Sequence, residues 1–357
     1  MRRTVALTSV VALGLTLAGA VSVHAAAETN DVPLAEGFDF NAPQIMAEGL
    51  EVPWGLTWLP DGDALVAERM TARLLRISAD GGTPVVAGTV PGVSPVGEAG
   101  LLGLAVSPDE WVYAYLTSAT DNRIVRFRLD AVGSPQTVLT GIPRGSIHAG
   151  GRIAFGPDGK LYAGAGDAGT TANAQNPASL GGKILRMNPD GTVPADNPTA
   201  GSLVYSLGHR NVQGLAWDAA GRLYASEFGQ NTWDEVNLIT PGANYGWPVV
   251  EGDGNDPRYV DPVVVWSTAA ASPSGAAISG STLYVAALRG ARLWTVPLGA
   301  DGGAGTPVAE LQGRFGRLRT VEVGPDGSLW VATSNRDGRG SPAPADDRVL
   351  RFPPAAS

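Results

Sequence analysis

The sequence has no cysteine, only three histidines and few charged residues. The absence of cysteine excludes disulfides, thiolate metal sites and lipid attachment at a cysteine. The scarcity of histidine argues against a zinc or copper centre. Charged residues make up 17% of the chain and the formal net charge is −9, so neither nucleic acid nor an anionic membrane surface is an expected partner. Against this acidic background, any cluster of arginines becomes informative.

The first residues, MRRTVALTSVVALGLTLAGAVSVHAAAE, have the pattern of a secretory signal peptide. Two arginines precede an apolar run, which ends in small residues around Val23-His24-Ala25. We therefore predict a signal peptide over residues 1–25, a single mature domain over residues 26–357 without a membrane span, and a secreted or periplasmic location. An uncleaved membrane anchor is the alternative, although the apolar run is short for a span.

Glycine (48 residues) and proline (27 residues) are abundant, and six similar segments divide the chain. The segments begin at Leu56, Leu104, Ile153, Leu215, Ala276 and Val321. Each contains a short apolar strand, a turn such as Pro-Asp-Gly, a β-rich strand such as LYVA, a loop and a third strand. A repeat of this length is typical of a four-stranded propeller blade. The sequence thus predicts an all-β, six-bladed β-propeller, whose last blade takes its outer strand from residues 37–50.

Polar residues that the repeat does not need recur in the loops before the inner strands and after the second strands. They are Glu98, His148, Arg210, Asn211, Trp266, Thr268, Arg289, Arg317 and Arg319. Their shared offset predicts that they converge at one mouth of the central channel. Arginines gathered there would repel one another without an anion, and the guanidinium fork matches carboxylates. We therefore expect a small ligand with several carboxylates, the alternative being that each arginine pairs with a nearby acid.

Two further features suggest chemistry at this mouth. His148 would act as a proton acceptor at neutral pH, unless it is a structural hydrogen-bonding residue, as we expect for His209. The stretch SEFGQNTWDEVNLITPGANYGWP offers Glu227, Asp234, Glu235 and turns that expose carbonyl oxygens. Hard cations prefer such oxygen ligands, so calcium fits, although an ordinary acidic surface loop is the alternative.

Five stretches together resemble the glucose/sorbosone dehydrogenase family. They are GEAGLLGLAVSPD, IHAGGRIAFGPDGKLY, GHRNVQGLAW, DEVNLITPGANYGWP and GRLRTVEVGPDG. The resemblance extends over nearly the whole mature chain, from about residue 49 to residue 353. The family fold is a six-bladed propeller, and its members include soluble aldose sugar dehydrogenases that use pyrroloquinoline quinone (PQQ).

The resemblance implies PQQ, a tricarboxylate, and Ca²⁺ as cofactors. It implies PQQ contacts at Glu98, Arg210, Asn211, Trp266, Thr268, Arg289, Arg317 and Arg319. It also implies that the carbonyls of Gly229 and Gln230 bind the calcium that contacts PQQ, and that Glu235 and Tyr245 belong to a second, structural calcium. His148 matches the catalytic base, which takes the anomeric proton of an aldose while hydride leaves C1 for the C5 carbonyl carbon of PQQ. The product is a lactone, and an external acceptor, a quinone or a redox protein, reoxidises the cofactor.

The sequence departs from the glucose-specific members of the family at positions that contact sugar. Ile147, Ala168 and Val263 replace an aspartate, a glutamine and a tyrosine, and Glu98 replaces a glutamine. Lost hydrogen bonds to sugar hydroxyls lower discrimination, so we expect broad aldose use. Two other functions stay open because propellers host many activities. They are a calcium-dependent lactonase-type hydrolase and a non-catalytic secreted binding module.

Overall fold

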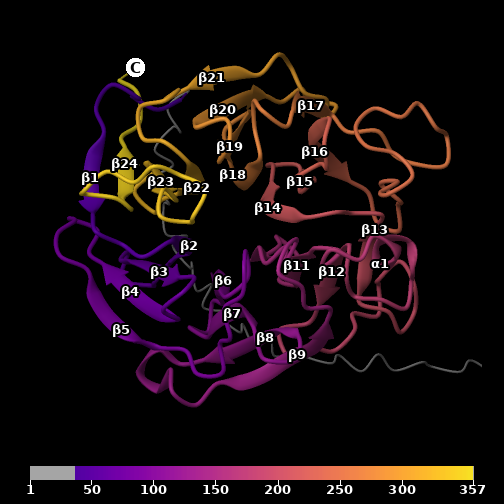
Figure 1. Cartoon of the computed structure of the whole chain (residues 1–357), viewed down its shortest axis with the longest axis horizontal. Coiled ribbons are helices and arrows are strands. Elements are labelled where there is room, and N and C mark those ends of the chain that lie inside the picture. The colour runs from indigo at the N-terminus through magenta and orange to yellow at the C-terminus, as the bar shows by residue number, and fades with distance from the viewer. Residues whose placement is uncertain (1–36, 357) are drawn as a thin grey trace, which may run out of the picture. The chain divides into compact units, whose positions relative to one another are not determined.

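The computed structural model describes residues 37–356, so the predicted signal peptide lies outside the described residues. Within the described range, no helix is long and apolar enough to cross a membrane. Six four-stranded antiparallel sheets form a ring (Figure 1), which confirms the predicted six-bladed β-propeller. The described residues contain two short helical segments, η1 (Leu129–Ala131) and α1 (Ala172–Gln175).

The blades follow one another along the chain, each running from an inner to an outer strand. Blade one holds β2 (Pro53–Trp58), β3 (Ala64–Glu68), β4 (Arg73–Ile77) and β5 (Val85–Thr89); blade two holds β6 (Leu101–Val106), β7 (Val112–Thr117), β8 (Asn122–Phe127) and β9 (Gln136–Ile142). Blade three holds β10 (Ile153–Phe155), β11 (Leu161–Ala165), β12 (Lys183–Met187) and β13 (Val204–Leu207); blade four holds β14 (Val212–Trp217), β15 (Leu223–Glu227), β16 (Trp233–Ile239) and β17 (Val264–Ser267). Blade five holds β18 (Pro273–Ser279), β19 (Thr282–Ala287), β20 (Arg292–Pro297) and β21 (Val308–Glu310).

Blade six closes the ring with strands from both ends of the described chain. It holds β22 (Leu318–Val323), β23 (Leu329–Thr333), β24 (Val349–Phe352) and β1 (Gln44–Ala47). The outer strand β1 pairs antiparallel with β24, Ile45 lying opposite Leu350. In Figure 1 the indigo β1 lies beside the yellow β24. The prediction that residues 37–50 supply this strand is therefore confirmed.

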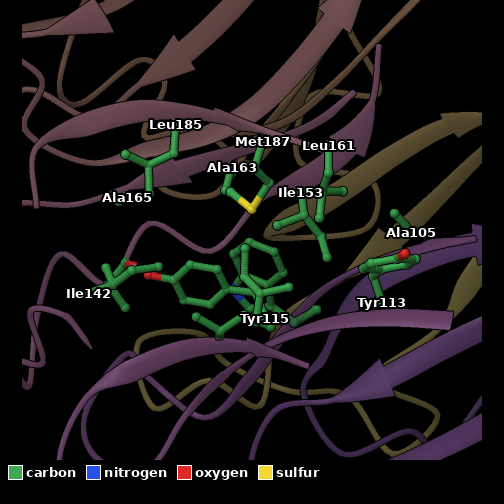
Figure 2. Close-up of a cluster of buried hydrophobic side chains, with 14 of the residues drawn as sticks. Ala105, Tyr113, Tyr115, Ile142, Ile153, Leu161, Ala163, Ala165, Leu185 and Met187 are labelled. Carbon is green, nitrogen blue, oxygen red and sulfur yellow. The ribbon is translucent and has the colours of Figure 1, made fainter. Parts of the chain in front are cut away.

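Apolar side chains fill the space between neighbouring blades. Between blades two and three, Tyr113 and Tyr115 of β7 face Ile153 and Leu161 (Figure 2), and all four are almost fully buried. The Tyr115 hydroxyl donates to the carbonyl of Ala149 at 3.0 Å. Because Ala149 follows His148, this core cluster also anchors the loop that carries the histidine.

The inner strands of neighbouring blades approach through their backbones, and glycine makes this possible. A Cβ atom on Gly55 of β2 would overlap the carbonyl oxygen of Leu102, and one on Gly103 of β6 would overlap that of Gly151. Neither glycine has an unusual backbone conformation, so the requirement is for space alone. This close approach fixes how far the loops at the channel mouth lie from one another.

Gly55→Ala is expected to destabilise the protein by about 1–3 kcal/mol, because the added methyl group forces the strands of two blades apart. Urea unfolding followed by tryptophan fluorescence measures the effect. Gly133→Ala is the matched control, since a Cβ there meets nothing within 4 Å. Equal midpoints for the two variants would contradict the proposed packing constraint.

Candidate active site

One end of the channel opens into a cavity of about 570 Å³. Its walls come from the loops before the inner strands and after the second strands of several blades. The lining residues are Arg69, Gly97, Glu98, Ser146, Ile147, Gln213, Phe228, Ser272, Leu288, Arg289, Arg317, Arg319, Asp337, Gly338 and Arg339. Four of the residues singled out in the sequence, Glu98, Arg289, Arg317 and Arg319, therefore share one cavity.

Other cavity residues were missed by the sequence analysis. Arg69 and Arg339 add two cations, while Asp337 and Gln213 add a carboxylate and an amide. A signal for Arg69 was present, because it follows the second strand of its blade as Arg289 follows that of blade five. Asp337 and Arg339 lie in a long loop between β23 and β24, where the repeat gives no fixed offset.

The cavity carries an excess of positive charge. Five arginines line it but only two carboxylates, Glu98 and Asp337. Asp337 binds Arg317 at 2.9 Å and lies 3.6 Å from Arg319. Burial, reinforced by the charge of Arg69, lowers the pKa of Arg319 to about 9. Within the described residues, the buried Nε atoms of Arg69 and Arg319 have no hydrogen-bond partner. Such donors and uncompensated charge suit an anionic ligand.

Glu98 is neutralised within the protein. One of its oxygens pairs with Arg339 at 2.7 Å, and the other accepts the backbone N–H of His148 at 3.1 Å. The carboxylate therefore joins loops of blades two, three and six.

His148 is held by an aspartate that the sequence analysis did not select. The Nδ1–H of His148 donates to Asp167 at 2.7 Å, and Asp167 is fully buried. Burial raises the pKa of Asp167, but bonds from His148, Trp247 and the backbone of Gly169 outweigh it and hold that pKa below its ordinary value. An ionised Asp167 fixes the proton on Nδ1, which leaves Nε2 as the proton-accepting nitrogen. His148 has a positive φ of 53°, and its neighbours Ser146 and Ile147 line the cavity.

Arg210 and Asn211 lie beside the cavity rather than in its lining. Arg210 donates to the carbonyl of Phe228 at 3.1 Å, and Phe228 lines both the main cavity and a smaller one that includes Arg210. Asn211 accepts the N–H of Gly150 at 3.0 Å. Within the described range, the buried Arg210 Nε and Asn211 Nδ2 atoms lack partners. Both residues thus carry unused donors next to the arginine cluster.

Trp266 and Thr268 are not brought to the cavity. Trp266 lies in the outer strand β17, where its ring stacks on Trp294 at 5.4 Å, and Thr268 bonds to the carbonyl of Asn231. Val263 lines the same outer groove as Trp266. The sequence analysis placed them at the channel mouth because they shortly precede the inner strand of blade five. In the structure they lie in and just after β17, which is the outer strand of blade four. Their predicted contacts with a cofactor or a sugar stay predictions.

Three of the four residues predicted to bind calcium, Gly229, Glu235 and Tyr245, line the smaller cavity, whereas Gln230 does not. Glu227 and Glu235 lie opposite each other on β15 and β16, and both line this cavity together with Gly229, Tyr245 and Glu251. Burial, and then the charge of Glu227, raise the pKa of Glu235 to about 8. The Tyr245 hydroxyl is occupied by backbone bonds at Leu238 and Thr240, which leaves its carbonyl oxygen as a ligand.

The arrangement does not meet every requirement of a preformed metal site. Among residues 37–356, no group of three or more His, Asp or Glu side chains stands ready to hold a metal ion. One oxygen of Glu251 accepts four successive N–H groups, from Gln230 to Trp233. His209 uses both ring nitrogens, on Ser206 and Glu227, as expected of a structural histidine.

Comparison with known proteins identifies the class to which this fold and site belong. The model of the Glucose / Sorbosone dehydrogenase family matches residues 50–342, so the chain belongs to this family of enzymes.

The chain is 54% identical to an aldose sugar dehydrogenase of Streptomyces coelicolor whose structure was solved in its PQQ-bound form, with a TM-score of 0.84 over 87% of this chain and 98% of that one. It is 46% identical to a putative oxidoreductase (glucose dehydrogenase) of Thermus thermophilus, with a TM-score of 0.81 over 87% and 99% of the two chains. It is 28% identical to the aldose sugar dehydrogenase YliI of Escherichia coli, over 83% of this chain and 90% of that protein.

Arg319→Met is expected to stabilise the ligand-free protein by about 1 kcal/mol, because it removes a buried cation with an unpaired Nε while Asp337 keeps Arg317. Thermal unfolding without ligand measures this gain. Arg258→Met, at an exposed ion pair, serves as control and should have little effect. A clear loss of stability in Arg319→Met would show that the cluster is already compensated without an anion.

Proposed function

We propose that this protein is a PQQ-dependent aldose sugar dehydrogenase that oxidises aldoses at C1 to lactones. The observation that carries the proposal is the arginine-lined cavity beside the His148–Asp167 pair. Its five arginines exceed its two carboxylates by three, and PQQ has three carboxylates. The PQQ-bound relative from Streptomyces coelicolor supports the same conclusion.

The residues present fit PQQ in number, chemistry and space. Arg69, Arg289, Arg317 and Arg319 would hold its carboxylates, and the unpaired Nε donors of Arg69 and Arg319 would gain acceptors. Glu98 would not repel the cofactor strongly, because Arg339 already neutralises it. When bound, PQQ supplies the electrophilic quinone that accepts hydride from the sugar.

The protein's own residues supply the proton transfer and the field. His148 Nε2 would accept the proton of the anomeric hydroxyl, since Asp167 keeps the other ring nitrogen protonated. The carboxylate of Asp167 would stabilise the resulting imidazolium without taking its proton. The buried Arg69 and Arg319 would stabilise negative charge that develops in the cavity, because burial strengthens their electrostatic interactions.

We also propose that calcium binds at the smaller cavity. The buried Glu227 and the half-buried Glu235 lie opposite each other there, and a divalent cation would relieve their repulsion. The carbonyl of Tyr245 is a candidate further ligand of this ion. The carbonyls of Gly229 and Gln230 would serve a second calcium, the one that contacts PQQ.

Broad sugar use is supported by the apolar surface next to His148. Ile147 is 40% exposed and lies against the loop of Ala168 and Gly169. Such a wall offers no hydrogen bond to a sugar hydroxyl, so it discriminates weakly between sugars.

An external acceptor, a quinone or a redox protein, would reoxidise the cofactor, and the protein would act outside the cytoplasm. A lactonase-type hydrolase is less well supported, because both carboxylates of the main cavity are paired with arginines.

Purified protein with added PQQ and Ca²⁺ is expected to reduce an artificial dye in the presence of glucose, galactose, xylose and maltose at rates within about tenfold of one another. His148→Ala should lower kcat by about 10²–10⁴-fold, because the general base is lost. His209→Gln is the comparison variant for loss of the other histidine of the described chain. Dye reduction without PQQ, lactone hydrolysis, or equal rates in His148→Ala and the parent would contradict the proposal.

Calcium is expected to raise the melting temperature of the protein, by an amount that corresponds to about 3 kcal/mol at a hundredfold excess over Kd. Glu235→Gln should lose most of this gain. In EDTA it should be more stable than the parent above about pH 8, where Glu235 of the parent is ionised beside Glu227, and nearly equal to the parent near neutral pH. Glu310→Gln, in the outer strand of blade five, is the control. An identical calcium response in Glu235→Gln would place the ion elsewhere.

A further inference from the structure

Trp247 lies where three parts of the site meet. Its indole Nε1–H donates to Asp167 at 2.9 Å, and the guanidinium of Arg210 lies 5.4 Å from the centre of its ring. Its backbone N–H donates to Gly208 at 3.0 Å, and its carbonyl accepts the Gln175 side chain at 2.7 Å. The residue is buried, so these contacts hold the indole in one orientation.

The Trp247 indole and the Gly169 N–H hold the two oxygens of the Asp167 carboxylate that faces His148. One oxygen of Asp167 accepts both His148 Nδ1–H and the N–H of Gly169. The other oxygen accepts only the indole of Trp247 among the described residues. Without that donor, only His148 and the Gly169 N–H would hold the carboxylate, both at one oxygen, so its rotation about the χ2 torsion would be less restricted.

Other charged groups near the pair do not replace this bond. Glu98 reaches His148 only through the backbone N–H, and Arg210 contacts Asp167 only through its own backbone carbonyl. Neither side chain donates a hydrogen bond to the Asp167 carboxylate in the described structure. Among residues 37–356, the indole is therefore the only side-chain donor, besides the histidine itself, to this carboxylate.

We propose that Trp247 is a positioning residue for the base: it fixes Asp167, and through it the Nδ1–H tautomer and ring orientation of His148, while its ring face supports Arg210. The catalytic consequence rests on the function proposed above, but the tautomer does not. One side chain thereby makes two functional contacts. The indole N–H of Trp247 binds Asp167, which orients His148, and the face of its ring contacts Arg210 beside the main cavity.

Two substitutions separate these tasks. Trp247→Phe keeps an aromatic face beneath Arg210 and removes the N–H, whereas Trp247→Leu removes both. Trp58→Phe is the matched control, because its buried indole nitrogen donates to no partner among residues 37–356. The first readout is ring-¹⁵N NMR of His148 in the ligand-free protein, with the signal assigned by its loss in His148→Gln.

Trp247→Phe is expected to weaken the Nδ1–H signal of His148 and to shift the ring toward a mixture of tautomers, while Trp58→Phe leaves it unchanged. In the reconstituted enzyme, Trp247→Phe should lower kcat about 10–100-fold with KM for the sugar and Kd for PQQ within twofold of the parent. Trp247→Leu should in addition weaken PQQ binding more than threefold, measured by equilibrium dialysis.

The proposal is overturned if the His148 spectrum of Trp247→Phe matches that of Trp58→Phe. A failure of the PQQ-dependent reaction would instead remove the proposed function and leave the NMR result intact. If Trp247→Phe does not fold, the indole N–H signal of Trp247 in the parent chain provides the test. Asp167→Asn should move that signal and leave the Trp58 signal in place, and an unmoved Trp247 signal would overturn the proposal.

Discussion

The pairing of β1 with β24 is the constraint on which the site depends. This ladder pairs the first described strand with the last and so closes the ring. Because β1 belongs to blade six and continues along the chain into β2 of blade one, it holds these two blades side by side. Arg69 belongs to blade one, and Arg317 and Arg319 belong to blade six. Closure therefore brings these cations into one cavity despite about 250 residues of intervening chain.

We expect the arginines held together at the cavity to lower the stability of the ligand-free protein. Burial depresses the pKa of both Arg69 and Arg319, which shows that the charged forms are poorly solvated there. Asp337 offsets part of this cost, and the rigid inner strands prevent the side chains from moving apart. Such a cavity is preorganised for an anion, because folding of the ring already brings the arginines together and the anion does not have to gather them on binding.

Much of the architecture could be predicted because turns and strand patterns are local properties. A tight turn, Pro-Asp-Gly in blades one, three and six, and a following LYVA-type strand recur along the chain, and they specify six units without any long-range information. The same offsets located Glu98, Arg289, Arg317 and Arg319 correctly at the cavity. They did not bring Trp266 and Thr268 to its lining, because these residues lie in and just after β17, the outer strand of blade four, although they shortly precede the inner strand of blade five.

The sequence by itself determined the fold, the family and the place of Arg289, Arg317, Arg319 and His148 near the channel mouth, since repeats and motifs are written in consecutive residues. Only the tertiary structure decided their partners. Asp167, Trp247 and Arg339 come from loops of three different blades, and nothing in their local sequence links them to His148 or Glu98. Those contacts depend on how far each loop reaches across a closed ring, which is set by the packing of whole blades.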